Sequence, residues 1–331
     1  MHIMNNRIPD QPPIIAPLSP EVHRPLWSVM IPTYNCSHYL EATLKSVLEQ
    51  DLGPALMQIE VVDDCSTDGD IAALVASIGK GRVSFYQQPE NRGSLRNFET
   101  CLNRAKGHFV HLLHGDDLSG QGIYQQATQL FEQYPDAGAI CTGFSYINEQ
   151  GAEINKSNAL KTETGVIQDW LLQIATGQKM QPPAVLVRRK VYEQLGGFFG
   201  IHYGEDWEMW VRIAAHYPVV YTPERLAYYR VHTSNITSRY FLSCQHILDI
   251  SKAIHLIQPY LPATERSRLK RQAQYNWSLY FARTTDMTYH KYNAPLQALN
   301  QAGKAFKMHP NKVTLYFLCK ILLKIMLRYK Q

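Results

Sequence analysis

Residues 111–118 have the sequence His-Leu-Leu-His-Gly-Asp-Asp-Leu, in which two adjacent carboxylates follow an apolar run. The run Phe109–Leu113 has the length and composition of a buried strand. Open α/β sheets bind ligands at the carboxyl ends of their strands. Magnesium and manganese are often held there by one or two carboxylates together with substrate phosphates. On its own, the pair Asp116-Asp117 fits a solvated turn and a metal site equally well.

Strands and helices alternate along the chain from Trp27 onward. The patterns predict strands at 27–31, 59–62, 83–86, 108–113, 139–144 and 184–187, and helices at 39–50, 71–78, 95–105, 121–134 and 205–216. Such alternation favours an α/β fold with a mainly parallel, doubly wound sheet. Because polar clusters follow several of the strands, we expect them to meet on one rim of the sheet.

The composition is that of a globular protein, with 331 residues, 45% of them hydrophobic and 18% charged. The formal charge of +5 comes entirely from residues 312–331, which hold five Lys and Arg and no acid. The rest of the chain is neutral, so no nucleic-acid partner is expected. Six scattered cysteines, none in a C-x-x-C pair, favour reduced thiols and a cytoplasmic location. No apolar stretch reaches the length of a membrane-spanning helix.

Three further polar clusters accompany Asp116-Asp117. Residues 31–35 provide a turn and a tyrosine ring that can stack on a base. Residues 62–68 provide carboxylates that can accept hydrogen bonds from a base or a ribose. Residues 204–210 place two acids at the start of a helix. Since the helix dipole favours an acid there in any case, N-capping is an alternative role for Asp206.

Together these residues resemble the inverting, family 2-type glycosyltransferases of the GT-A fold. The resemblance covers residues 27–237 and rests on the order and spacing of P-T-Y-N, V-D-D-x-S-T-D, N-x-G with a downstream Asn, L-H-G-D-D, G-E-D-W-E-M-W and Y-R-x-H-x-x-N. It implies a GT-A sheet with a helical C-terminal extension. It also implies metal-dependent transfer of a sugar from a nucleotide-diphosphate sugar to an acceptor hydroxyl, in cell-surface polysaccharide or glycoconjugate synthesis.

The resemblance carries site residues over motif by motif. For the nucleotide sugar it implies Pro32, Thr33, Tyr34, Asp64, Asn91, Gly93, Asn97 and Asp116. Asp206 matches the catalytic base, with Glu205 as its neighbour. A divalent cation, Mn²⁺ or Mg²⁺, is expected on Asp117 and His232. A UDP-sugar is the default donor, with GDP and dTDP open, and the acceptor is expected to be a glycan or lipid-linked.

One motif departs from the common pattern at His114, where many members of the family have an acid. Asp116 and Asp117 are then the only acids of this cluster, which leaves the ligand set of the metal open. We expect His114 to be a buried, hydrogen-bonded histidine rather than a ligand. Asp63 is expected to cap its turn, and Asp68 to cap the helix that follows.

Two other functions stay open on the sequence alone. A nucleotidyltransferase also binds metal and nucleotide with carboxylates on an α/β sheet. It would need a Gly-rich, basic phosphate loop, which residues 27–45 lack. The other alternative is a degenerate relative that holds a nucleotide sugar at the membrane surface without catalysis.

The expected organisation has three parts. Residues 1–25 form a Pro-rich flexible arm, and residues 26–237 form the catalytic domain, with a nucleotide-binding half up to residue 120 and an acceptor half from 121. Residues 238–331 are helical and end in a tail, 312–331, with basic residues every four positions on one helix face. For this tail, peripheral contact with the inner face of the cytoplasmic membrane and packing on protein are equal alternatives.

Overall fold

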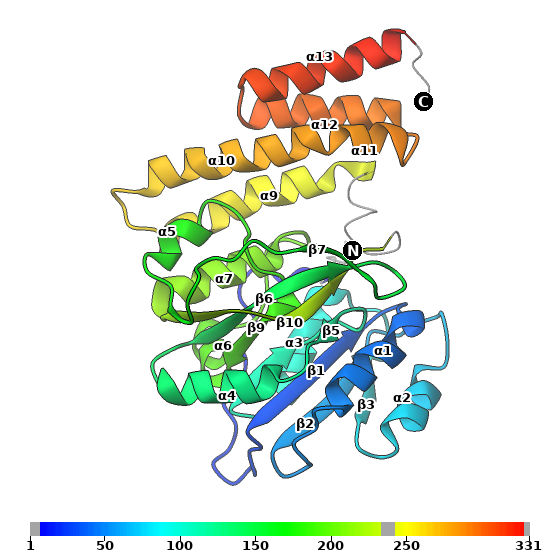
Figure 1. The fold of residues 1–331 in the computed structure, drawn as a ribbon, viewed down its shortest axis with the longest axis vertical. Helices are drawn as coiled ribbons and strands as arrows, with labels where there is room; N and C mark the ends of the chain where they lie inside the picture. The colour runs from blue at the N-terminus through cyan, green and yellow to red at the C-terminus, as the bar shows by residue number, and fades with distance from the viewer. Residues whose placement is uncertain (1–6, 233–241, 328–331) are drawn as a thin grey trace, which may run out of the picture. The chain divides into compact units, whose positions relative to one another are not determined.

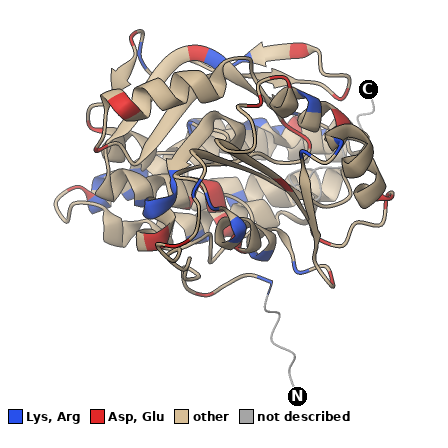
Figure 2. Ribbon diagram, turned by 90° about the horizontal axis from the view of Figure 1, so that it is seen from below, with Lys and Arg blue, Asp and Glu red and all other residues tan. Residues whose placement is uncertain are grey.

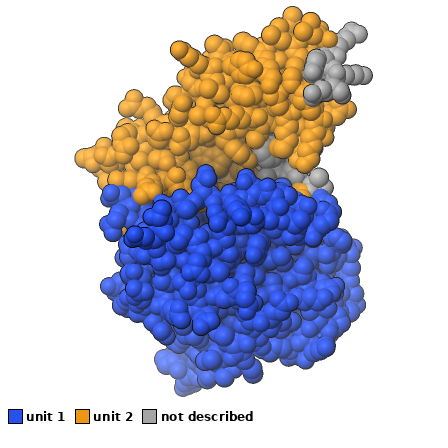
Figure 3. Space-filling view, in the orientation of Figure 1, with its two compact units in different colours: residues 1–170, 180–202, 216–231 blue, residues 171–179, 203–215, 232–331 orange. Residues whose placement is uncertain are grey.

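The computed structural model describes residues 7–232 and 242–327. The chain divides into two compact units, which Figure 3 shows in different colours. Unit 1 consists of residues 1–170, 180–202 and 216–231, and unit 2 of residues 171–179, 203–215 and 232–331. The domain boundaries expected from the sequence stay predictions.

Unit 1 is built on a ten-stranded mixed sheet (Figure 1). Its strands are β1 (Trp27–Thr33), β2 (Met57–Asp63), β3 (Ser84–Gln87), β4 (Phe109–Leu112), β5 (Leu118–Ser119), β6 (Ala139–Ile147), β7 (Glu153–Lys156), β8 (Gly165–Val166), β9 (Val185–Arg188) and β10 (Val219–Arg230). The main order is β3-β2-β1-β4-β9-β6-β10-β5. The first four strands are parallel, whereas β9 is antiparallel to both of its neighbours. The expected α/β fold with a doubly wound sheet is confirmed.

Helices cover both faces of this sheet, with α1 and α2 on one face and α3 on the other (Figure 1). The helices of unit 1 are α1 (Ser37–Leu48), α2 (Ile71–Gly79), α3 (Ser94–Arg104), α4 (Ile123–Gln133) and α6 (Arg189–Leu195), with the 3₁₀ helix η1 (Pro182–Ala184). Asp70, not Asp68, caps α2, by accepting the N–H of Ala73 at 2.9 Å. Asp68 instead accepts the N–H of Ser37 at the start of α1, so the predicted role of Asp68 is wrong.

The core of unit 1 lies on both faces of β1, whose seven residues are all buried. A strand with helices on both sides has no solvent face, which explains its continuous apolar sequence. Trp27 is fully buried and packs against Phe109, Tyr124 and Phe131, while its indole N–H donates to Thr128.

The described part of the N-terminal segment, residues 7–25, has no helix or strand but is packed on the rest of unit 1. The carbonyls of Pro9 and Pro13 accept the backbone N–H groups of Gly200 and Gly197, each at 2.8 Å. Ile15 is fully buried. The expectation of a flexible arm is therefore wrong for these residues, because the prolines hold the backbone extended and its carbonyls pair with unit 1.

Unit 2 is helical, so the expected helical C-terminal extension is confirmed. Its helices are α5 (Trp170–Ile174), α7 (Glu205–His216), α9 (Gln245–Leu256), α10 (Arg266–Arg283), α11 (Thr285–His290), α12 (Pro295–Met308) and α13 (Lys312–Met326), with the 3₁₀ helix η2 (Gln258–Tyr260). The buried amide of Gln301 in α12 donates to the carbonyl of Phe281 in α10 and accepts from Thr288 in α11. Asn311 starts α13 with a capping box.

Charged residues of both signs are interspersed along the ribbon (Figure 2), as expected from the neutral balance of residues 1–311. Among the described helices, none combines the length and apolar character that crossing a bilayer requires.

Candidate functional site

The ends of three neighbouring strands lie in register at the rim of the sheet. Thr33 of β1 is opposite Asp63 of β2, which in turn is opposite Gln87 of β3. The Thr33 hydroxyl donates to Asp63 at 3.2 Å, and the Thr33 backbone carbonyl accepts the N–H of Asp64 at 2.9 Å. Asp63 also accepts the backbone N–H and the hydroxyl of Ser66. Its predicted role as a turn-capping acid is confirmed.

Asp64 is the centre of a second set of contacts, which we call the Asp64 cluster (Asp64, Asn91, Arg92 and Gly93). Its Oδ1 accepts the N–H of Arg92 at 2.8 Å. Its Oδ2 accepts the N–H of Gly93 at 2.8 Å and the amide of Asn91 at 3.0 Å. Burial raises the pKa of Asp64, while the backbone N–H groups of Arg92 and Gly93 and the nearby Arg7 act to lower it. Gly93 has φ +89°, which favours glycine at this position.

The other residues predicted to bind the nucleotide lie in different surroundings from one another. Asn97 is buried, and its amide donates to the Val62 carbonyl at 2.8 Å, so it ties α3 to the end of β2. Tyr34 is 45% exposed, which excludes a core role. Pro32 is buried in β1, and its carbonyl accepts the N–H of Gly115.

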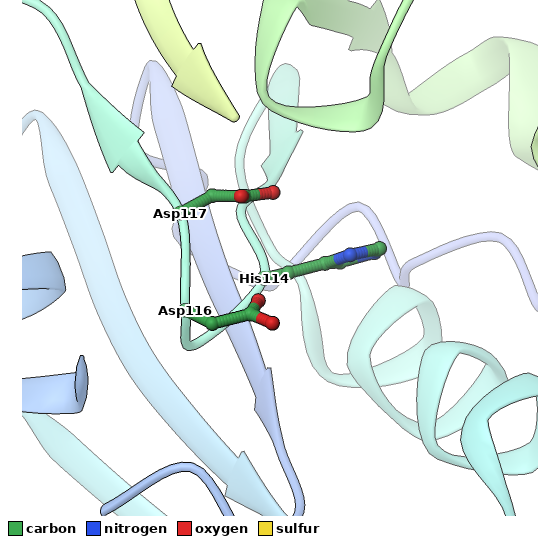
Figure 4. A group of neighbouring side chains, drawn as sticks. All are labelled: His114, Asp116 and Asp117. Carbon is green, nitrogen blue, oxygen red and sulfur yellow. The ribbon is translucent and has the colours of Figure 1, made fainter. Parts of the chain in front are cut away.

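The loop between β4 and β5 carries the acidic cluster, by which we mean His114, Asp116 and Asp117. The three side chains extend to the same side of the loop (Figure 4). One possible ligand atom from each lies within 4.8 Å of the others. The His114 ring is half-buried and stacks on Phe98, with centroids 5.1 Å apart. The ring thus lies beside both acids, and the expectation that His114 is a hydrogen-bonded histidine rather than a ligand stays a prediction.

Asp117 is 1% exposed and uses only one of its oxygens within the described chain. Oδ1 accepts the N–H of Arg230 at 2.8 Å, whereas Oδ2 is buried with no hydrogen-bond partner among the described residues. Burial, and then the charge of Asp116, raise the pKa of Asp117 well above its usual range. An unpaired buried carboxylate oxygen is costly, and carboxylates suit Mg²⁺ and Mn²⁺. The residues present therefore fit a divalent cation.

Arg230 links this loop to the far end of β10. Its guanidinium donates to the carbonyls of Asp116 and Asn148, at 2.7 and 3.0 Å, and lies over the ring of Tyr39. Its main contacts are with backbone carbonyls, which no sequence pattern announces.

Asp206, in unit 2, is the second residue of α7. The residue before the helix is Gly204, whose carbonyl accepts the N–H of Glu208, so the N-cap alternative for Asp206 is wrong. Asp206 Oδ1 accepts the N–H of Trp207 at 2.8 Å, and Oδ2 accepts the side-chain amide of Gln178. Burial raises the pKa of Asp206 to about 6. Burial and the charge of Asp206 raise the pKa of Glu205 well above its usual range.

Gln178 was not found by sequence reasoning. It lies on the loop after α5, which two further contacts hold in place. The Trp207 indole N–H donates to the Ile174 carbonyl at 2.7 Å, and the Asn276 amide donates to the Thr176 carbonyl at 2.9 Å. A single glutamine in an irregular segment belongs to no sequence motif, so its contact with Asp206 could not be predicted.

His232, the last described residue before residue 242, is buried and belongs to unit 2. Within unit 1 the structure brings together Thr33, the Asp64 cluster and the acidic cluster on the strand ends and the loops that follow them. Within unit 2 it places Glu205 and Asp206 side by side at the start of α7. The function of every one of these residues stays a prediction.

Comparisons with known proteins place the chain in a family. The model of glycosyl transferase family 2 matches residues 28–196. An uncharacterized protein of Mycobacterium tuberculosis, MT1568, is 28% identical over 74% of this chain and 80% of its own length. The poly(ribitol-phosphate) beta-N-acetylglucosaminyltransferase TarS of Staphylococcus aureus is 23% identical over 50% of this chain, and the match spans only 29% of TarS.

Solved structures agree on the fold. Residues 1–349 of TarS in complex with UDP-GlcNAc match with a TM-score of 0.65 at 16% identity, over 92% of this chain and 93% of that one. A mannosyltransferase from Pyrobaculum calidifontis in complex with GDP-Man and Mn²⁺ matches with a TM-score of 0.56 at 18% identity, over 97% and 84%. Since the family model covers half of the sequence, the chain belongs to glycosyl transferase family 2 and is a glycosyltransferase of the GT-A fold.

Proposed function

We propose that the chain transfers a sugar from a nucleotide-diphosphate sugar to an acceptor hydroxyl, with a divalent cation and with inversion at the anomeric carbon. The observation that carries the metal requirement is Asp117, whose buried Oδ2 has no hydrogen-bond partner among the described residues and lies in the acidic cluster. The family assignment favours this reaction over the nucleotidyltransferase alternative.

Asp117 and Asp116 would hold the cation, with the His114 ring as a third donor within reach. His232 stays a predicted ligand. When bound, the cation would neutralise charge on the diphosphate leaving group as a Lewis acid, a contribution of several kcal/mol. The protein orients Asp117 in advance, because Arg230 fixes Oδ1 and the carbonyl of the preceding residue.

Asp206 would remove the proton from the acceptor hydroxyl as it attacks the anomeric carbon. A pKa of about 6 leaves this carboxylate ionised at neutral pH and makes it a stronger base than an ordinary aspartate. General-base catalysis contributes roughly 10²–10⁴-fold. A single base with direct displacement predicts inversion.

The donor is proposed to be a UDP-sugar, with its base against Asp64 and the ring of Tyr34. Support comes from TarS, solved with UDP-GlcNAc, while the mannosyltransferase solved with GDP-Man keeps GDP open. TarS is named for a poly(ribitol-phosphate) acceptor. We accordingly propose a glycan or lipid-linked acceptor in cell-surface polysaccharide synthesis.

The test compares donor binding with transfer in Asp206→Asn and Asp117→Ala, with exposed Asp136→Asn as a matched control. Asp206→Asn should bind UDP-sugar with Mn²⁺ as tightly as the wild type but transfer at least 100-fold more slowly. Near-normal turnover would refute the base. A wild-type chain that binds donor but neither transfers nor hydrolyses it, with any acceptor tried, would support the non-catalytic alternative.

We also propose that α13 contacts an anionic membrane surface, through a different face from the one expected. Lys320 and Lys324 both bind Asp286, so these two members of the predicted basic stripe are paired with protein, and Arg328 lies outside the described residues. Apart from Lys312 and Cys319, the exposed side chains of α13 and its C-cap are large and apolar, with exposed fractions of 40–76%: Leu315, Tyr316, Leu322, Leu323, Met326 and Leu327.

Charge favours lipid as the occupant of this apolar face. After Asp286 the sequence contains no acid but eight Lys and Arg. An anionic surface would be attracted to such a segment, at about 1 kcal/mol for each Lys or Arg near the lipid. A second copy of the chain would instead bring the same basic charges face to face.

A further inference from the structure

The loop that carries Gln178 connects Asp206 to the helical C-terminal extension, entirely within unit 2. The Gln178 amide donates to Asp206 Oδ2. Two residues earlier, the Thr176 carbonyl accepts the side-chain amide of Asn276 at 2.9 Å. Asn276 lies on α10, 100 positions after Thr176 in the chain. A residue of the extension therefore holds the backbone beside the glutamine that contacts the proposed base.

The amide of Asn276 is oriented by its own helix. Its oxygen accepts the side-chain amide of Gln272, one turn earlier in α10, at 2.9 Å. Because the oxygen is engaged there, the NH₂ group of Asn276 is directed at the Thr176 carbonyl. An exposed asparagine loses side-chain entropy when both ends of its amide are held. This side chain is thus fixed in one orientation by two protein contacts.

The residue between Thr176 and Gln178 packs on the next residue of α10. Gly177 has φ +153°, a conformation that favours glycine, and a Cβ added there would lie 3.9 Å from Trp277 Nε1. The Trp277 ring packs against Trp207, with centroids 5.5 Å apart. Trp207 follows Asp206 in α7. The contacts therefore run from α7 through the loop to α10 and back to α7 through the two tryptophans.

These contacts replace the support that a helix or strand would give to Gln178. The residues 175–181 are in neither, so the backbone of Gln178 is held by its neighbours' contacts with α7 and α10. A hydrogen bond depends on the distance and angle between its partners. The bond from Gln178 favours the ionised carboxylate of Asp206, and its strength depends on how firmly the loop is held.

The charged groups at this place are Glu205, which precedes Asp206 in α7, and Asp249 of α9, which acts on Glu205. Asn276 is neutral, so its replacement by alanine changes no charge near Asp206. An effect of Asn276 on Asp206 must then pass through the loop.

We propose that Asn276 is a positioning residue for Asp206: it holds the loop so that the Gln178 amide stays on the carboxylate, and in this way α10 sets the strength of the catalytic base. This inference rests on the proposed function in one respect, that Asp206 is the base.

Carboxyl-carbon NMR of the full chain, labelled at aspartate, measures the titration of Asp206 directly, and the signal lost in Asp206→Asn identifies it. Asn276→Ala should raise the pKa of Asp206, because the Gln178 amide is held less firmly. Gln178→Ala should raise this pKa at least as far, and adding Asn276→Ala to Gln178→Ala should raise it no further. Asn276→Gln can still donate and should recover part of the change.

The pH profile of transfer is the second measurement. In Asn276→Ala the acidic limb of kcat should move to higher pH, so kcat at pH 6 should fall about two- to fivefold. The value of kcat well above the limb and KM for the donor should not change. Gln297→Ala, which removes an exposed amide from α12, is the matched control. Unchanged thermal melting of each variant shows that folding is intact.

Three results would overturn the inference: an unchanged titration of Asp206 in Asn276→Ala, a loss of kcat that is equal at every pH, or an effect of Asn276→Ala that persists in full beside Gln178→Ala. Failure of the proposed function gives a different result. The Asp206 signal would then titrate at higher pH in Asn276→Ala while the pH profile of kcat stayed where it was.

Discussion

The backbone N–H of Arg230 donates to Asp117 Oδ1 at 2.8 Å and joins two residues 113 positions apart in the chain. The Arg230 side chain also holds the Asp116 carbonyl at 2.7 Å. One oxygen of Asp117 is thereby fixed, and the other is left buried without a hydrogen-bond partner among the described residues. The loop of the acidic cluster is thus oriented by protein contacts, which leave one carboxylate oxygen for the cation proposed above.

Asp117→Asn should separate metal binding from stability. An Asn can keep the bond from Arg230 but lacks the charge, so the affinity for Mn²⁺ should fall on the order of 100-fold or more, beyond what loss of a supporting contact causes. The metal-free variant should melt at the wild-type temperature or above, because a buried charge has been removed. Titration with Mn²⁺ and thermal denaturation measure the two effects. Asp136→Asn should change neither, and an unaltered Mn²⁺ affinity in Asp117→Asn would assign the cation elsewhere.

Gly115 in the acidic loop should not tolerate a methyl group. A Cβ there would lie 2.5 Å from Thr33 Cγ2, at the end of β1, and 2.9 Å from Cys36 Sγ, in the turn that follows β1. Gly115→Ala should therefore destabilise unit 1 by about 1–3 kcal/mol through overpacking. Gly303→Ala, in α12, is the matched control, because no heavy atom beyond the surrounding helix backbone lies within 4 Å of its added Cβ. It should stabilise the protein by up to about 1 kcal/mol through helix propensity. Urea unfolding measures the change in the free energy of unfolding for both variants. If the loop relaxed freely around the added methyl group, Gly115→Ala would not be destabilised.

Much of this arrangement could be predicted because it depends on short-range patterns. The apolar runs of β1, β2 and β4 and the acids that follow them are local signals, and parallel strands necessarily bring such acids to one rim. The strands β5 and β8 have two residues each, which is too short to show the alternation of apolar and polar residues, so they were not predicted. The contact between Arg230 and the Asp116 carbonyl was missed for another reason. Backbone carbonyls have no sequence signature, so a residue that binds them cannot be paired with its partner in advance.

The N-cap of α2 shows that the sequence can offer two equally suitable residues for one structural role. Asp68 and Asp70 both precede the helix within three residues, and either has the chemistry of an N-cap. Asp70 caps the helix, because the Asp68 carboxylate accepts the N–H of Ser37 at the start of α1, a contact across 31 residues. The contact between Gln178 and Asp206 also could not be predicted from the sequence, since only the fold brings these two residues together.

The pH dependence of transfer should report Asp206. A base must be deprotonated to act, and burial raises the pKa of Asp206 to about 6, so kcat should fall as the pH drops below about 6 and level off above it. The Gln178 amide favours the ionised form by donating to it. Gln178→Ala should therefore move the acidic limb to higher pH and lower kcat at pH 6, with KM for the donor unchanged. Gln178→Glu should move the limb further in the same direction, since it adds a negative charge.

Gln297→Ala, on the exposed side of α12, is the control for these profiles and should match the wild type. If Gln178→Ala lowers kcat equally at every pH, the glutamine supports the loop only and does not act through Asp206.

The apolar face of α13 should bind anionic lipid. Leu323 and Met326 are 55% and 76% exposed. Replacing both with Ser should reduce sedimentation of the full chain with vesicles that contain phosphatidylserine, because less apolar surface enters the interface. Vesicles of phosphatidylcholine alone should bind weakly, since they lack the anionic term. Leu248→Ser, 49% exposed on α9, should not change binding. If the double variant sediments like the wild type, or if the wild type is a dimer that this variant dissociates, α13 serves protein association and the membrane assignment fails.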